Sequence, residues 1–307
     1  PEVIILYYLG VDGGGTHTTA VVADKNGNII AKADGGSINY NSIGLECARS
    51  NMKEIILWLC EACQISSFAC AFIGMSAISS RASREETLSF VDGIIRADKV
   101  IMDSDVYIAL AALDEKDLCA VTISGTGSMS AGRKKDGEII HTGGWGHILG
   151  DEGSAYSIAI DAVKAAVRGY EKSGPETALT SSVKDYYGIS NYLELIDIFY
   201  NPPIEKSEIA KFSPKVFECA ESGDKVANEI LKNNAKELAK TTLALLSRLE
   251  GCNILGVWGG VFQNKKSYLE MFMQSINEKL PHIKVALLPN PPVIGAVTAA
   301  IKEGEKI

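Results

Sequence analysis

Residues Leu9–Thr19 read LGVDGGGTHTT, and an apolar strand over Val3–Val11 leads into this stretch. The strand ends at Asp12, and three glycines and a threonine follow at once. Because glycine has no Cβ, the turn can bend sharply and bring several backbone N–H groups to one point, as a phosphate requires. An acid at the strand end suits the Mg²⁺ that accompanies phosphates. We therefore predict a phosphate-binding β-hairpin, with an ordinary tight turn as the alternative.

A second stretch, residues 120–140 (AVTISGTGSMSAGRKKDGEII), repeats this pattern. It contains a strand, a turn of small residues, a second strand, a Lys-Asp-Gly turn and a third strand. Gly15-Thr16 aligns with Gly125-Thr126 without a gap. Two related hairpins predict two domains of like fold that face each other across a cleft. Two ordinary antiparallel meanders remain the alternative.

Composition and charge narrow the class of protein. The chain has 307 residues and a formal net charge of −8, which fits two globular domains. No run of five or more basic residues is present, and this argues against nucleic acid as a partner. No signal peptide or membrane span is visible, so we expect a cytoplasmic protein without a membrane partner. The seven cysteines lie in apolar contexts, including a C-x-x-C at Cys60 and Cys63, and are predicted to be buried thiols rather than a zinc or redox site.

Strands alternate with helices along the rest of the chain, which predicts α/β domains with helices on both faces of a mixed sheet. The predicted helices cover residues 42–63, 84–96, 105–113, 154–169, 205–222, 225–249, 265–279 and 293–300. The predicted strands outside the hairpins cover residues 69–74, 100–103, 253–258 and 284–288. Residues 174–191 show the weakest pattern and are expected to be a mobile helical insertion.

Three further motifs complete the pattern: Gly143–Ala155 (GGWGHILGDEGSA), Trp258–Val261 (WGGV) and Pro292–Ala300 (PVIGAVTAA). With the two hairpins, they make the chain resemble the N-acetylglucosamine kinases and the related BadF/BadG/BcrA/BcrD ATPases, within the sugar kinase, Hsp70 and actin superfamily. The resemblance covers nearly the whole chain, in the expected order. It implies two ribonuclease H-like (actin-like ATPase) domains of mixed sheet flanked by helices. Residues 1–117 would form the first, completed by the C-terminal helix 292–307, and residues 118–291 the second.

The resemblance also implies roles in phosphoryl transfer. Asp12 would hold Mg²⁺ through water, and Asp105, at the start of a helix, would be the catalytic base. A helix N-terminus stabilises a carboxylate, but Asp105 could also be a plain helix cap, and Asp103 is a competing candidate for the base or a helper of the metal. The role of His17 is open. ATP and its phosphates would be bound by the loops that contain Gly13, Gly14, Gly15, Thr16, Gly125, Thr126, Gly127, Gly259 and Gly260.

The sugar would be held by residues of several loops, and their side chains suit the task. The amide of Asn39 can both donate and accept, and Trp145 offers a flat apolar face for a sugar ring. Core packing is the alternative for Trp145. Asp151 can accept from hydroxyls while helping to cap the helix that begins near Ser154. The expected sugar contacts are Asn39, Ser76, Asp105, Thr126, Gly144, Trp145 and Asp151.

The function implied is ATP-dependent phosphorylation of an amino sugar by a homodimeric enzyme that uses ATP and Mg²⁺. N-acetylglucosamine, at its 6-hydroxyl, is the expected substrate, in amino-sugar metabolism or cell-wall recycling. N-acetylmuramic acid and unacetylated glucosamine stay open, because one or two pocket side chains decide between them. An activator ATPase that holds an iron–sulfur cluster is an alternative, although no cysteine follows the second glycine-rich turn in a matching place. A non-catalytic sugar sensor is another, and the presence of both Asp12 and Asp105 argues against it.

Overall fold

The computed structural model describes residues 6–78, 81–113 and 119–306, and the chain forms two compact units. The first consists of Pro1–Val121 together with Leu288–Ile307, and the second of Thr122–Leu287. Residues 3–5 of the first predicted strand and residue 118, the predicted start of the second domain, lie outside the described residues.

The first unit is built on a five-stranded mixed sheet in the order β3-β2-β1-β4-β5. Its strands are β1 (Tyr8–Gly13), β2 (His17–Ala23), β3 (Ile29–Gly36), β4 (Phe68–Met75) and β5 (Ala97–Asp103). The hairpin strands β1, β2 and β3 pair antiparallel, whereas β1, β4 and β5 run parallel. The predicted hairpin and mixed sheet are therefore confirmed.

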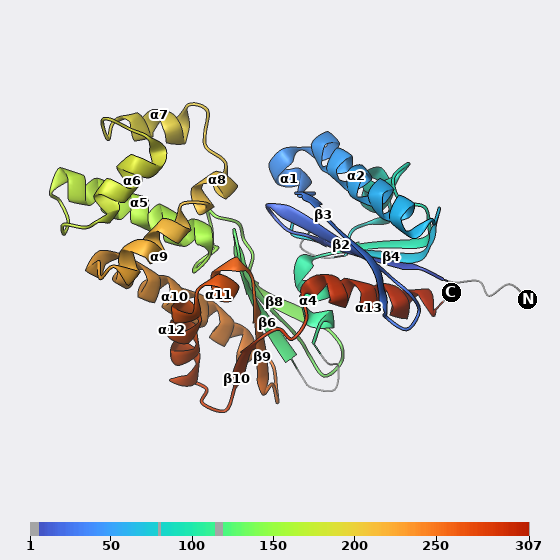
Figure 1. The fold of residues 1–307 in the computed structure, drawn as a ribbon. Helices are drawn as coiled ribbons and strands as arrows, with labels where there is room; N and C mark the ends of the chain where they lie inside the picture. The colour runs from blue at the N-terminus through green and yellow to red at the C-terminus, as the bar shows by residue number, and fades with distance from the viewer. Residues whose placement is uncertain (1–5, 79–80, 114–118, 307) are drawn as a thin grey trace, which may run out of the picture. The chain divides into compact units, whose positions relative to one another are not determined.

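Helices cover both faces of this sheet (Figure 1). They are α1 (Tyr40–Ile43), α2 (Leu45–Cys63), α3 (Arg84–Val91), α4 (Asp105–Ala111) and α13 (Pro292–Gly304). Side chains alternate along β1, as they must in a strand. Leu9 and Val11 pack with α2 in one core cluster, while Tyr8 packs with α13 in another. The single helix predicted over 42–63 is wrong, because Gly44 adopts φ +80° and separates α1 from α2.

The last helix, α13, packs on the first sheet although it lies at the end of the chain. Two glycines allow its backbone to approach closely. A Cβ on Gly10 would lie 2.5 Å from the Val297 nitrogen, and one on Gly295 would lie 1.9 Å from the Ile108 carbonyl oxygen in α4. Neither position can carry a side chain without moving the helix.

The second unit contains another five-stranded sheet, in the order β10-β9-β6-β7-β8. Its strands are β6 (Cys119–Ser124), β7 (Ser128–Arg133), β8 (Ile139–Gly143), β9 (Ile254–Trp258) and β10 (Lys284–Leu287). Strands β7 and β8 pair antiparallel and β9 and β10 parallel, so this sheet is also mixed. Buried hydroxyls of Thr122, Ser130 and Thr242 hydrogen-bond one another and join β6 and β7 to a long helix, α10 (Lys225–Leu246).

The helices of the second unit are α5 (Ala155–Glu171), α6 (Leu179–Tyr187), α7 (Glu194–Tyr200), α8 (Lys206–Ala210), α9 (Ser213–Glu221), α10 (Lys225–Leu246), α11 (Gly260–Asn264) and α12 (Lys266–Asn277). The helix predicted over 205–222 is two helices, and Pro214 lies in the first turn of α9. A proline is tolerated there, but it cannot continue a preceding helix. None of the described helices combines the length and apolar character needed to cross a membrane.

The cysteines differ in exposure. Cys70, Cys219 and Cys252 are buried, Cys60 and Cys63 are partly buried, and Cys47 is exposed. The prediction of buried thiols therefore holds for only part of the set. No group of three or more potential metal-ligating His, Cys, Asp or Glu side chains occurs among the residues that the structure describes.

Candidate active site

Three strand ends of the first sheet lie side by side. Asp12 on β1 is in register with Gly74 on β4, and Gly74 is in register with Asp103 on β5. The strands are parallel, so their carboxyl ends meet at the same edge of the sheet, where ligands of open α/β sheets bind. Asp105 follows as the first residue of α4, and its neighbour Ser104 is the N-cap, accepting from the Tyr107 N–H. Asp105 is therefore not the helix cap.

The carboxyls of Asp12 and Asp105 influence each other. Burial, together with the charge of Asp105, raises the pKa of Asp12 to about 7. Burial also raises the pKa of Asp105 to about 6, although backbone N–H groups at the start of α4 oppose the shift. Two neighbouring carboxylates in surroundings poor in water are costly. A divalent cation that prefers oxygen ligands would relieve this cost, so the donor set fits Mg²⁺.

Asp103 is engaged differently from Asp105. Its Oδ1 accepts from the Ser104 N–H at 2.7 Å, and its Oδ2 lies 3.9 Å from Nε of Arg81. Burial raises the pKa of Asp103, while Ser104 and Arg81 oppose that shift. The carboxyl of Asp103 thus organises its own loop, and this favours Asp105 as the carboxyl available to a substrate.

The first glycine-rich turn is joined to two of the predicted sugar loops. The Nδ2 of Asn39 donates to Oγ of Ser76 at 3.0 Å, and the Ser76 N–H donates to the Gly13 carbonyl at 3.0 Å. The Ser37 hydroxyl donates to the Gly14 carbonyl at 3.2 Å. A Cβ on Gly13 would lie 2.6 Å from the side chain of Ile38. The missing side chain at Gly13 therefore lets the loop that carries Asn39 pack directly on the turn.

The second unit brings its own set of motifs together. In the second glycine-rich turn, the Gly125 N–H donates to the Gly127 carbonyl at 2.9 Å, and the Ala155 N–H at the start of α5 donates to the Gly125 carbonyl. Gly259 adopts φ +107°, and a Cβ there would lie 2.2 Å from the Ser124 carbonyl oxygen. The missing side chain at Gly259 thus makes room for the backbone of Ser124. A Cβ on Gly260 would lie 3.7 Å from Nδ2 of Asn264, an ordinary van der Waals distance, so this position is less crowded than Gly259.

Asp151 has two partners that the sequence did not indicate. Its side chain is 4% exposed and forms an ion pair with Lys206, with 2.6 Å between Oδ2 and Nζ. Its Oδ1 accepts from the Ser128 N–H at 3.0 Å. Asp151 does not cap α5 with its side chain, because Ser154 is the N-cap and accepts from the Ser157 N–H. Nothing in the sequence around Asp151 indicated Lys206, which lies 55 residues later.

Trp145 projects from the loop between β8 and α5 and is 70% exposed. Core packing, the alternative considered for this residue, is therefore wrong. Gly144 and Gly146 on either side have φ values of +74° and +77°, which a side chain would strain. The two glycines thus set the path of the loop and leave the indole ring available to a ligand.

The sequence as a whole matches one family model, that of the BadF/BadG/BcrA/BcrD ATPases, over residues 9–302. The chain belongs to this ATPase family. It is 33% identical over 304 residues to the N-acetylmuramic acid/N-acetylglucosamine kinase of Clostridium acetobutylicum, covering 97% of this chain and 99% of the relative. It is 27% identical over 310 residues to the N-acetyl-D-glucosamine kinase of Dictyostelium discoideum, covering 96% and 97%.

The fold of this BadF/BadG/BcrA/BcrD family member is also found in solved structures. One is a ROK family glucokinase from Streptomyces griseus, solved in complex with glucose and AMPPNP. The two chains share 17% sequence identity with a TM-score of 0.63, covering 96% of this chain and 99% of the glucokinase. The match establishes a shared fold, and the two mixed five-stranded sheets flanked by helices confirm the predicted α/β class.

Residues that the sequence motifs did not indicate hold the loops of this ATPase in place. The Gly153 carbonyl accepts from the Ser124 hydroxyl at 2.8 Å and from the Tyr268 hydroxyl at 2.9 Å. The Gly153 N–H donates to Oδ1 of Asn234 at 3.3 Å. These contacts tie α10 and α12 to the turn before α5. The partners in these hydrogen bonds lie 29 to 115 residues apart in the sequence, so the contacts become visible only in the three-dimensional structure.

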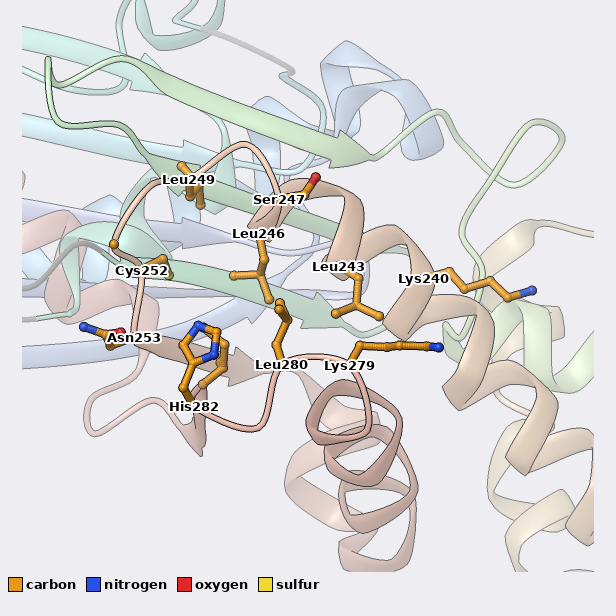
Figure 2. Close-up of a pocket in the computed structure, with 12 residues that line it drawn as sticks. Lys240, Leu243, Leu246, Ser247, Leu249, Cys252, Asn253, Lys279, Leu280 and His282 are labelled. Atoms are coloured by element: carbon orange, nitrogen blue, oxygen red, sulfur yellow. The ribbon is translucent and has the colours of Figure 1, made fainter.

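A hollow on this family member is lined by residues other than those of the predicted site. A depression of about 470 Å³ lies between the C-terminal part of α10 and the segment that joins α12 to β10, and Figure 2 shows residues that line it. Its walls include Leu243, Leu246 and Leu280, and Lys240 and His282 are also among the residues that line it. No residue of the predicted site lines this hollow.

Proposed function

We propose that this chain is an ATP-dependent kinase that phosphorylates the 6-hydroxyl of N-acetylglucosamine and also accepts N-acetylmuramic acid. Membership of an ATPase family and the similarity to two amino-sugar kinases support this proposal. The observation that carries it is the pair of carboxyls, Asp12 and Asp105, at the strand ends beside a glycine-rich turn and the Asn39–Ser76 pair. This arrangement combines an oxygen site for a cation, a base and polar groups suited to hydroxyls.

Asp105 would be the base of the reaction. It would orient the sugar hydroxyl and accept its proton as the new O–P bond forms, a late transfer in a loose transition state. Asp12 would hold Mg²⁺ through water, and the turn of Gly13, Gly14, Gly15 and Thr16 would bind phosphate oxygens. When bound, Mg²⁺ would neutralise negative charge on the phosphates.

The predicted sugar contacts offer polar groups and one flat apolar face. Asn39 and Ser76 share a hydrogen bond, so they can act as one polar surface for adjacent hydroxyls. Trp145, with Gly144 beside it, offers an exposed flat face for the ring or for the acetamido methyl group. Thr126 would approach the sugar or the γ-phosphate from the second glycine-rich turn.

The nucleotide would be bound by the second unit through Gly125, Thr126, Gly127, Gly259 and Gly260. The close approach of Gly259 to Ser124 joins two of these motifs within one unit. At Gly260, where a Cβ would lie 3.7 Å from Nδ2 of Asn264, adenine or ribose would lie against the backbone. A homodimeric state, a cytoplasmic location and a place in cell-wall recycling complete the proposal.

An assay of sugar-dependent ADP release tests this function. The purified protein is given Mg·ATP with N-acetylglucosamine, N-acetylmuramic acid, glucosamine, N-acetylmannosamine or glucose, each in turn. Turnover with the first two sugars and little with glucose is the expected result. Preference for glucosamine would assign the unacetylated substrate instead. ADP release that does not depend on any sugar would contradict the kinase function.

A further inference from the structure

Lys206 lies against the second glycine-rich turn. It is the first residue of α8, and its Nζ donates to Oδ2 of Asp151 at 2.6 Å. A Cβ on Gly127 would lie 2.7 Å from this Nζ and 2.9 Å from Oδ1 of Asp151. The ammonium group therefore occupies the space that a side chain at Gly127 would fill.

The Lys206–Asp151 pair differs from the ion pairs on the surface of the same unit. Lys240 and Glu237, for example, are one helical turn apart and both are about half exposed. The side chain of Asp151 is 4% exposed and that of Lys206 27% exposed, and the two residues lie 55 positions apart in the sequence. A carboxylate so deeply buried needs strong partners, and Asp151 has two: the Lys206 ammonium and the Ser128 N–H. Asp151 thus fixes the ammonium relative to the backbone of the turn.

The ammonium retains capacity to bind an anion. It has three N–H donors, and within the described residues Asp151 is the one acceptor hydrogen-bonded to it. The side chain of Lys206 is 27% exposed, so it remains partly accessible. Backbone N–H groups of a glycine-rich turn attract phosphate oxygens, and a lysine beside them adds a full positive charge. A local positive charge favours phosphate binding in a protein whose formal net charge is −8.

We propose that Lys206 is a catalytic residue that donates a hydrogen bond to the phosphoryl group being transferred. It would contact the γ-phosphate of ATP before transfer and the phosphate of the sugar ester afterwards. Asp151 is then a positioning residue that holds Lys206, and Gly127 provides the space. This inference rests on the proposed kinase function. No proton leaves Lys206, which acts only by charge and hydrogen bonding.

Isothermal titration of nucleotides without sugar tests this inference independently of turnover. Wild type, Lys206→Met, Lys206→Arg and the surface control Lys240→Met are titrated with Mg·AMPPNP and Mg·ADP. Lys206→Met should bind AMPPNP at least 10-fold more weakly and ADP within about 2-fold of wild type, because ADP lacks the γ-phosphate. Lys206→Arg should recover much of the AMPPNP affinity, and Lys240→Met should match wild type. Equal losses for both nucleotides, or no loss for either, would overturn the proposal.

Kinetics and melting temperatures complete the test. In Lys206→Met, kcat should fall about 100-fold for N-acetylglucosamine and N-acetylmuramic acid alike, while the melting temperature shows that the protein is folded. A rise in KM confined to N-acetylmuramic acid, with AMPPNP affinity unchanged, would assign Lys206 to the sugar carboxylate and overturn the phosphoryl role. If wild type shows no sugar-dependent turnover, the proposed function fails, while the difference between AMPPNP and ADP still reports on Lys206.

A second variant is needed in case Lys206→Met does not fold. Gly127→Ala leaves the ion pair chemically intact but places a methyl group where the ammonium lies. As in Lys206→Met, the affinity for AMPPNP should fall more than the affinity for ADP. Unchanged affinity for AMPPNP in a folded Gly127→Ala protein would contradict the proposed position of Lys206.

Discussion

Three aspartates within or next to the strand ends of the first sheet have different surroundings. Asp103 is engaged by Ser104 and Arg81, whereas Asp12 and Asp105 share a region in which burial raises both pKa values. Residue type alone does not separate these roles, because all three are carboxylates. The neighbouring groups in space distinguish them: they give Asp103 a structural role and leave Asp12 and Asp105 for the proposed chemistry.

Replacement of Asp105 tests its assignment as the base. Asp105→Asn keeps the size of the side chain but cannot accept a proton, so kcat should fall by about 10²–10⁴-fold. Asp103→Asn is the matched control, two residues earlier, and should keep most of its turnover while losing some thermal stability. Steady-state kinetics and melting curves of both variants provide the comparison. A larger loss of kcat in Asp103→Asn would assign the base to Asp103.

Glu303 on α13 provides a stability prediction with a defined pH range. A hydrogen bond from Lys99 at 2.6 Å, opposed by burial and aided by Lys306, lowers the pKa of Glu303 to about 2 from an ordinary value of 4.5. Because the pKa of Glu303 is lower in the folded state than in the unfolded state, its ionised carboxylate stabilises the folded state above pH 4.5. This stabilisation is lost as the pH falls from 4.5 to 2. Glu303→Gln should therefore cost about 1–2 kcal/mol at pH 7, after allowance for solvent screening.

Thermal melts of wild type and Glu303→Gln across pH 7 to 3 measure this difference. The gap between the two melting temperatures should narrow below pH 4.5. A gap that stays constant from pH 7 to pH 3 would show that the ion pairs of Glu303 do not contribute through its charge.

At the scale of secondary-structure elements, small residues determine how closely α13 approaches its neighbours. Its Ala296, Ala299 and Ala300 pack with Tyr8 and other core residues on one face of the first sheet. Close contact between backbones is possible where no Cβ intervenes, as at Gly295. The small-residue composition of α13 therefore reflects packing against the sheet and α4.

Gly295→Ala tests this packing because helix propensity and packing predict opposite effects. In an exposed helix the change would stabilise by up to about 1 kcal/mol. Here the new methyl group would lie 1.9 Å from the Ile108 carbonyl oxygen and 2.6 Å from the Ala112 nitrogen. We expect a loss of about 1–3 kcal/mol in the free energy of unfolding, measured by urea denaturation. Thr298→Ala on the same helix serves as the control, and a gain in stability for Gly295→Ala would refute the close contact.

At the scale of the whole molecule, the first unit is discontinuous in sequence. It joins Pro1–Val121 to Leu288–Ile307, with the entire second unit between them. Val293 and Val297 of α13 pack against Val21 and Ala23 of β2, so the last segment completes a core begun by the first hairpin. The first unit can therefore reach its final packing only when the end of the chain is present.

Truncation of the chain after Asn290 tests this dependence. Loss of α13 would expose apolar residues on one face of the first sheet, and we expect the first unit to become sensitive to protease while the second unit survives. Truncation after Gly304 keeps α13 and should leave both units resistant. Limited proteolysis with mass spectrometry identifies the surviving fragments. Protection of the first unit without α13 would show that the remaining elements suffice.

The sequence by itself determined the two glycine-rich hairpins, the mixed α/β sheets and the family, because these depend on residues that are neighbours along the chain. Strand periodicity, turn residues and the acid after a strand are all local features. Local patterns failed where a single residue breaks an element, as at Gly44 between α1 and α2.

Only the tertiary structure decided which side chains meet across long stretches of sequence. It joined Asn39 to Ser76, buried Asp151 beneath Lys206, and brought Tyr268 to the Gly153 carbonyl. Such contacts arise when whole elements pack, and their energies depend on burial and distance rather than on spacing along the chain. For this reason the sequence, which predicted Asp151 as a sugar contact, did not indicate its ion pair with Lys206 at the second glycine-rich turn.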